Sequence, residues 1–133
     1  MKRKIKFRIW DSENIDSPKM QYCDLLKVCD NGLFFEISKF DGYKHHNDTD
    51  NPTIMQFTGI EDAYINGTEV YEGDIIENCD TKALQIVYWN EYKAAWYCRY
   101  VEDEKRIVSL SDSIGNLNKV IGNIFENHEL VKL

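Results

Sequence analysis

The sequence predicts a mainly β protein with minor α content, in which a small antiparallel meander precedes an SH3-like β-barrel. Two Asn-Gly pairs, Asn31-Gly32 and Asn66-Gly67, lie between runs of β-forming residues. Both residue types tolerate the positive φ that tight hairpin turns require. About five short apolar runs then follow between residues 70 and 125, at intervals typical of small barrels and sandwiches. The barrel is an analogy of strand pattern and implies no ligand.

The length of the chain, 133 residues, suits one domain or two very small ones that share a core. The change in pattern falls at residues 58–66. We therefore predict an N-terminal antiparallel β region over residues 1–60 and an SH3-like barrel region with a C-terminal tail over residues 61–133.

The N-terminal region begins with the clearest strand, residues 2–10. Ile5, Phe7 and Ile9 alternate with basic residues, so the apolar side chains share one face of this strand. The remaining elements are expected in this order: strands over 20–28 and 33–37, a polar loop over 40–52, a short strand over 55–58, and a helical turn or connector over 60–64.

The second region starts with a strand over residues 68–71. Gly73-Asp74 interrupts this run, and glycine suits a tight corner or bulge there, before Ile75-Ile76 restart a strand. Gly122 predicts a bend or a close approach. The later elements are expected in this order: a hairpin of strands over 84–90 and 94–101, a short strand over 106–110, a capped helical turn over 111–117, a closing strand over 120–125, and the tail.

Four sequence blocks resemble, in order, those of the YopX family of bacteriophage and prophage proteins. They are KFRIWD at residues 6–11, MQFTGI at 55–60, VYEGDII at 70–76 and VIGNIFEN at 120–127. The resemblance implies a small, β-rich protein carried by phages or prophages of bacteria. It implies no reaction and supplies no catalytic residue. Residues 40–51 depart most from the family pattern, and nothing is carried over to them.

Charge and composition indicate the compartment and exclude some partners. The formal net charge of −7 opposes broad binding to nucleic acid or anionic membranes, which requires a basic surface. No stretch approaches the ~20 apolar residues of a membrane span, and residues 1–10 lack the apolar segment of a signal peptide. The four cysteines include no Cys-x-x-Cys pair, which argues against a zinc ribbon or a thioredoxin-like centre. Their even number would allow disulfides, but without a signal peptide we expect reduced thiols in the bacterial cytoplasm.

Two charged clusters each allow a functional and a structural interpretation. The acidic cluster is either a site or a solvated turn, and the absence of a neighbouring histidine or basic residue favours the turn. The basic face of the first strand is either a strip that binds phosphates and stacks bases or a solvated strand face, and we favour the solvated face. The acidic cluster consists of Glu69, Glu72, Asp74 and Glu77, and the basic face of Lys4, Lys6, Arg8 and Trp10.

The loop predicted over residues 40–52 contains residue types that bind metals. Adjacent histidines point in opposite directions in an extended chain, so they rarely ligate one ion together. We therefore predict a polar loop, with no metal and no cofactor. The residues concerned are Asp41, His45, His46, Asp48 and Asp50.

Exposed aromatic residues favour a non-catalytic protein-binding module, because aromatic side chains dominate binding hot spots. The expected partner is a host or phage protein, and a second copy of the chain is a further candidate. A nucleic-acid-associated protein that uses the basic strand is the alternative. An enzyme is least favoured, because no nucleophile–base pair, phosphate loop or metal spacing occurs. The predicted binding residues are Trp10, Tyr71, Asp74, Trp89, Tyr92 and Trp96.

Overall fold

The computed structural model describes residues 4–11, 19–29, 32–37, 42–46, 53–62 and 67–132. The chain divides into two compact units, Met1–Phe57 and Thr58–Leu133. The described strands form two antiparallel sheets, so the prediction of a mainly β protein is confirmed.

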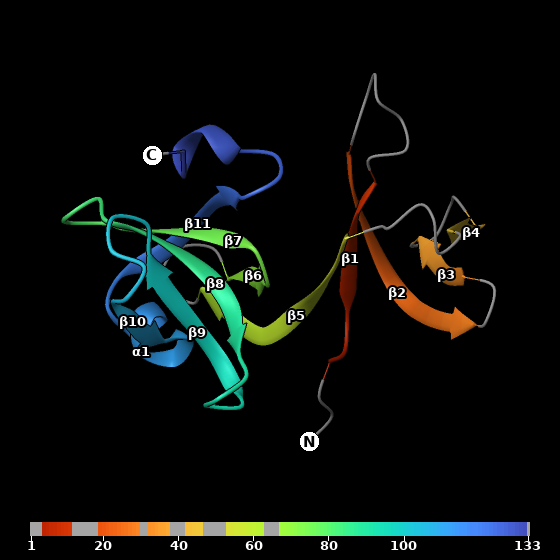
Figure 1. Cartoon of the computed structure of the whole chain (residues 1–133), viewed down its shortest axis with the longest axis horizontal. Coiled ribbons are helices and arrows are strands. Elements are labelled where there is room, and N and C mark those ends of the chain that lie inside the picture. The colour runs from red at the N-terminus through yellow and green to blue at the C-terminus, as the bar shows by residue number, and fades with distance from the viewer. Residues whose placement is uncertain are drawn as a thin grey trace. The chain divides into compact units, whose positions relative to one another are not determined.

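The order of the strands defines each sheet (Figure 1). One sheet has six strands in the order β4 (Gly42–His46), β3 (Gly32–Ile37), β2 (Lys19–Cys29), β1 (Phe7–Asp11), β5 (Thr53–Asp62) and β6 (Thr68–Tyr71). The other has five strands in the order β10 (Ile107–Ser109), β9 (Ala95–Tyr100), β8 (Leu84–Asn90), β7 (Asp74–Asn78) and β11 (Asn118–Asn123).

The described strands do not close into a barrel. In the five-stranded sheet, β10 and β11 are the two edges, and they are not neighbours in its hydrogen-bonded order. One physical reason is length, since β10 has only three residues and can form few ladder bonds. The chain between these edges forms the helix α1 (Leu110–Gly115) instead.

The N-terminal unit contains the predicted meander and one unpredicted strand. Antiparallel pairing of β2 with β3 brings Cys29 opposite Gly32, as the predicted hairpin requires. Residues 42–46 were expected in a loop, but they form β4 and pair with β3. Ladder hydrogen bonds come from the backbone, so a polar stretch can complete a sheet that offers a free edge.

Strand β5 is longer than the predicted strand over residues 55–58. It continues to Asp62, where a helical turn or connector was expected. Gly59 adopts a φ of +87° within the strand, which glycine does without a steric penalty. Beyond it, the backbone N–H of Ile60 donates to Thr58 Oγ1 at 3.2 Å, and this hydroxyl donates to the Val70 carbonyl at 2.7 Å. Asn66 lies outside the described residues.

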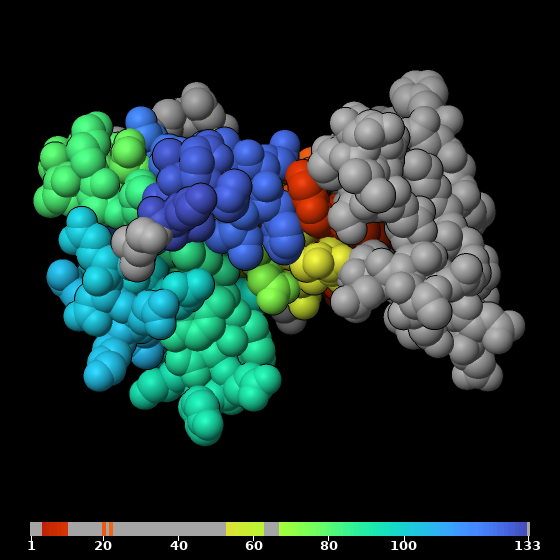
Figure 2. Space-filling model, turned by 45° about the horizontal axis from the view of Figure 1, so that its top comes forward, coloured from red at the N-terminus to blue at the C-terminus, as the bar shows by residue number. Residues whose placement is uncertain are grey.

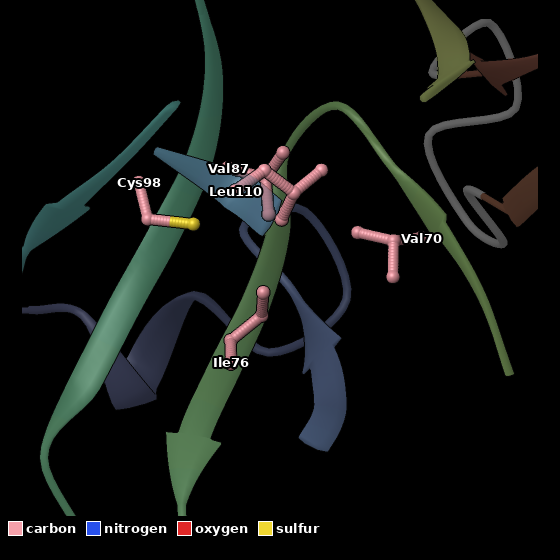
Figure 3. Packing of buried hydrophobic residues seen from close by; sticks show 5 residues of the cluster. All are labelled: Val70, Ile76, Val87, Cys98 and Leu110. Carbon is pink, nitrogen blue, oxygen red and sulfur yellow. The ribbon is translucent and has the colours of Figure 1, made fainter. Parts of the chain in front are cut away.

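The C-terminal unit has its own hydrophobic core (Figure 3). Five fully buried side chains form its centre: Val70, Ile76, Val87, Cys98 and Leu110. Leu110 opens helix α1, whose N-cap residue Ser109 accepts a hydrogen bond from the Asp112 N–H at 3.3 Å. The predicted capped helical turn is therefore confirmed, but it begins at Leu110, which was expected in the preceding strand. The helix thus places an apolar residue in the core.

A buried carboxylate joins three segments of this unit. Asp62 is 2% exposed, and its two oxygens accept from backbone N–H groups at opposite ends of the unit's sequence. Oδ1 accepts from Thr68 at 2.9 Å and Oδ2 from Val120 at 3.0 Å. The side chain thus links the end of β5 with the start of β6 and with β11.

Gly122 lies at a close approach, as predicted. Pairing of β11 with β7 shifts register between Val120 and Gly122, which marks a bulge. A Cβ atom at position 122 would overlap Oδ1 of Asn127 and lie 2.7 Å from its Cγ. That Oδ1 accepts a hydrogen bond from the Asn123 N–H at 3.2 Å. The absence of a side chain at Gly122 therefore lets the following turn fold back on the strand.

Candidate functional site

The hairpin of β8 and β9 brings three predicted binding residues together. Trp89 and Trp96 lie directly opposite each other in the register, and their rings meet edge to face with centroids 5.1 Å apart. Trp96 also packs against the buried core, whereas Trp89 is 45% exposed. Tyr92, in the turn between the strands, is 99% exposed. The turn projects from the body of this unit at the lower edge of the view (Figure 2).

Asn90 fixes the shape of this turn. Its side-chain oxygen accepts hydrogen bonds from the backbone N–H groups of Tyr92 and Lys93, both at 3.0 Å. Its amide nitrogen donates to the Tyr88 hydroxyl at 3.2 Å. Ala94 closes the turn with a φ of +50°. Tyr92 is therefore presented to solvent on a backbone that local hydrogen bonds hold in place.

The other predicted binding residues have different surroundings. Tyr71 is 4% exposed and Asp74 is 2% exposed. Asp74 Oδ2 accepts from the Tyr71 N–H at 2.8 Å across a turn in which Gly73 has a φ of +86°. These residues shape the corner between β6 and β7. Trp10, in the N-terminal unit, is half-buried in β1, with Met20 and Thr53 opposite it on the neighbouring strands.

The basic face of β1 is less solvated than the sequence predicts. Arg8 is only 2% exposed. Lys6 is half-buried, and its Nζ lies 5.8 Å from the centroid of the Phe57 ring. Lys4 alone of the predicted basic residues is exposed. The expectation of a solvated face is therefore wrong for Arg8. Ile9, on the opposite face of the strand, is also buried, so both faces of β1 are covered at this point.

Within the described residues, no three His, Cys, Asp or Glu side chains are grouped so that they could hold a metal ion. The side chains of His45 and His46 lie outside that part. Among the same residues, no helix has the length and apolar character needed to cross a bilayer. Cys79 and Cys98 are free thiols, and burial raises the pKa of Cys98 to about 11.

A polar pocket in the C-terminal unit was not predicted from the sequence. It has a volume of about 350 Å³ and is lined by residues from β7, β8, β9, β10, α1 and β11. Its side chains include Asn78, Gln85, Tyr100, Arg106, Ser113 and Asn118. These positions converge only when the five-stranded sheet and helix α1 have formed. A sequence signal existed in the closely spaced asparagines at positions 116 and 118.

Hydrogen bonds between buried groups hold the floor of this pocket. Ser113 donates its hydroxyl proton to Gln85 Oε1 at 2.5 Å. Asn118 Nδ2 donates to the Ser113 hydroxyl at 3.0 Å and to the Ser113 carbonyl. Asn118 is 2% exposed, yet its Oδ1 accepts no hydrogen bond from any described residue. Arg106 lies over the Tyr100 ring, with 4.2 Å between its Cζ and the ring centroid.

These features define a small, mainly β protein with an aromatic hairpin and a polar pocket in one of its two compact units. The model of the YopX protein family matches residues 6–132, so the chain belongs to the YopX family.

Two solved structures show the same fold. The crystal structure of YopX from Bacillus subtilis matches with a TM-score of 0.57 at 18% identity, over 96% of each chain. The crystal structure of EF1440 from Enterococcus faecalis matches with a TM-score of 0.52 at 22% identity, over 96% of this chain and 98% of that chain. A comparison with curated proteins found no match.

Proposed function

We propose that the protein is a non-catalytic protein-binding module that a phage or prophage uses in the bacterial cytoplasm to contact a host or phage protein. The contact surface is the hairpin tip, formed by Trp89 and Tyr92. The single observation that carries this proposal is the exposure of two large aromatic side chains at the end of a hairpin whose turn Asn90 holds in shape. Tyrosine and tryptophan are enriched in binding hot spots, and a fixed backbone lowers the entropy cost of association.

The order of the five-stranded sheet supports an SH3-like architecture for this unit. Strand β11, the last in sequence, lies beside β7, and β8, β9 and β10 follow on its other side. Helix α1 separates β10 from β11. A hairpin followed by a late strand that returns to the first strand is the pattern on which the SH3-like analogy rests. The analogy concerns architecture, and the hairpin itself carries the functional argument.

The partner is a protein with an apolar cleft that receives a projecting tip. A projecting turn offers little area of its own, so its aromatic side chains must enter a recess to be desolvated. Acidic side chains do not dominate the tip, since Glu91 and Lys93 flank Tyr92 with opposite charges. Recognition should therefore depend on aromatic burial more than on long-range electrostatic attraction, and salt should weaken it little.

The proposal is tested by affinity capture of the tagged protein from phage-infected bacterial lysate, with and without nuclease. A host or phage protein should be retained after nuclease treatment. Tyr92→Ala should lower its recovery about tenfold or more, as expected for a hot-spot residue. Tyr22→Ala is the matched control, because Tyr22 is a 47% exposed tyrosine in the other unit. This control should retain the partner.

Three outcomes would overturn the assignment. Equal recovery with Tyr92→Ala and Tyr22→Ala would remove the hairpin tip from the interface. Recovery that is lost on nuclease treatment would favour nucleic acid. Capture of the protein itself alone would favour self-association over a host or phage partner.

A further inference from the structure

The pocket in the C-terminal unit differs in charge from the chain as a whole. The chain has a formal net charge of −7, but among the described residues that line the pocket only Arg106 is charged. Its guanidinium lies over the Tyr100 ring, and a planar guanidinium has five N–H donors, so it can contact an aromatic ring and still donate to a ligand. Such a group recognises carboxylates and phosphates, so an anion suits this pocket.

Asn118 adds a second requirement. Its amide nitrogen donates to the hydroxyl and the carbonyl of Ser113, and these two hydrogen bonds fix the orientation of the amide. Oδ1 is then the side-chain atom that is left for a hydrogen bond with another group. This oxygen is buried and accepts no hydrogen bond from any described residue. A buried acceptor that stays unsatisfied destabilises a fold, so native proteins rarely leave one without a partner. Asn118 lines the pocket, so a small shift of its side chain on ligand entry would bring this oxygen to an N–H or O–H group of the ligand.

The size of the pocket limits what can enter. Its volume of about 350 Å³ lies at the lower end of the range of about 300–1,000 Å³ for small-molecule sites. From size, charge and the unsatisfied acceptor together, we infer that the pocket binds a small organic anion that carries an N–H or O–H donor. This inference does not depend on the hairpin, because no pocket residue belongs to the turn over residues 91–94.

The test uses three matched probes on the full-length protein. N-acetylglycine has both a carboxylate and an amide N–H, acetate has only the carboxylate, and N-methylacetamide has only the N–H. Binding is followed by nuclear magnetic resonance of the side-chain NH₂ groups of Asn118 and Gln85. N-acetylglycine should shift these signals saturably, with a dissociation constant at least about tenfold lower than that of either other probe.

Two charge-neutralising variants locate the anion. Arg106→Gln should weaken binding of N-acetylglycine about tenfold or more. Lys105→Gln removes a positive charge from the adjacent residue, which is exposed and does not line the pocket, so it should leave the affinity unchanged. Arg106 is itself exposed, so its substitution should preserve the fold.

Several results would overturn the inference. The absence of a saturable shift, or equal affinity for all three probes, would contradict it. So would equal binding by the two variants, or a crystal soaked in N-acetylglycine with only water on Asn118 Oδ1. If acetyl-Ala-Ala-Gly bound at least tenfold tighter than N-acetylglycine, the pocket would take the carboxyl end of a polypeptide, and the assignment to a small molecule would be wrong.

Discussion

Replacement of the Asp62 carboxylate by an amide should strongly destabilise the C-terminal unit. Both oxygens accept backbone hydrogen bonds in a site that is 2% exposed. Asp62→Asn keeps one acceptor and places an NH₂ group against the N–H of Thr68 or Val120. The loss of a hydrogen bond to a charged group lowers stability by about 1.5–3 kcal/mol. The buried backbone N–H that is left without an acceptor lowers it by about 1–3 kcal/mol more. We expect a loss of about 3 kcal/mol in the free energy of unfolding.

Urea unfolding followed by tryptophan fluorescence would measure this loss. A Trp10→Phe background restricts the signal to Trp89 and Trp96, which both belong to the C-terminal unit. Asp103→Asn is the control, because its Oδ1 also accepts from a backbone N–H, that of Lys105 at 3.1 Å, but the residue is exposed. This control should change stability by less than about 0.5 kcal/mol. A loss below about 1 kcal/mol for Asp62→Asn would refute the reasoning.

Three further predictions concern the same unit. Gly122→Ala should lower the free energy of unfolding by about 1–2 kcal/mol, because the new Cβ displaces Asn127. Gly115→Ala is the control and should not destabilise the protein, because nothing lies within 4 Å of its new Cβ. Urea unfolding measures both variants. Burial raises the pKa of Cys98 from 9.0 to about 11, so the unfolded thiol ionises first. The free energy of unfolding should then fall by about 2–3 kcal/mol between pH 9 and 11, and Cys98→Ala should flatten that slope. Residues 58–133 expressed alone should give a dispersed amide spectrum, whereas an unfolded fragment would contradict the predicted division into two domains.

The parts of the fold that local chemistry determines could be predicted from the sequence. Gly32 and Gly73 each mark a turn or corner whose requirement lies within a few neighbouring residues. Strands rich in β-forming residues, such as Leu84–Asn90, follow in the same way. Strand β4 and the second half of β5 were missed, because they depend on neighbouring strands that supply hydrogen-bond partners rather than on their own composition.

The candidate sites, too, could be predicted only where their residues lie close together in the sequence. Trp89, Tyr92 and Trp96 lie within eight positions of each other in one hairpin, so the sequence alone could group them. Tyr71 and Asp74 were grouped with them on residue type, and their burial became visible only in the structure. The pocket was missed because its residues extend from position 78 to position 118 and meet only through sheet pairing. Long-range convergence of this kind leaves little trace in a single sequence.

The edge-to-face contact of Trp89 with Trp96 has a spectroscopic consequence. At 5.1 Å and an interplanar angle of 73°, the excited states of the two indoles should couple and give a paired positive and negative band in circular dichroism. Exciton coupling falls steeply with distance, so the paired band should vanish when the hairpin opens. It should change shape when a bound protein covers Trp89. The proposed contact surface therefore contains its own optical reporter, and occupancy can be followed without a label.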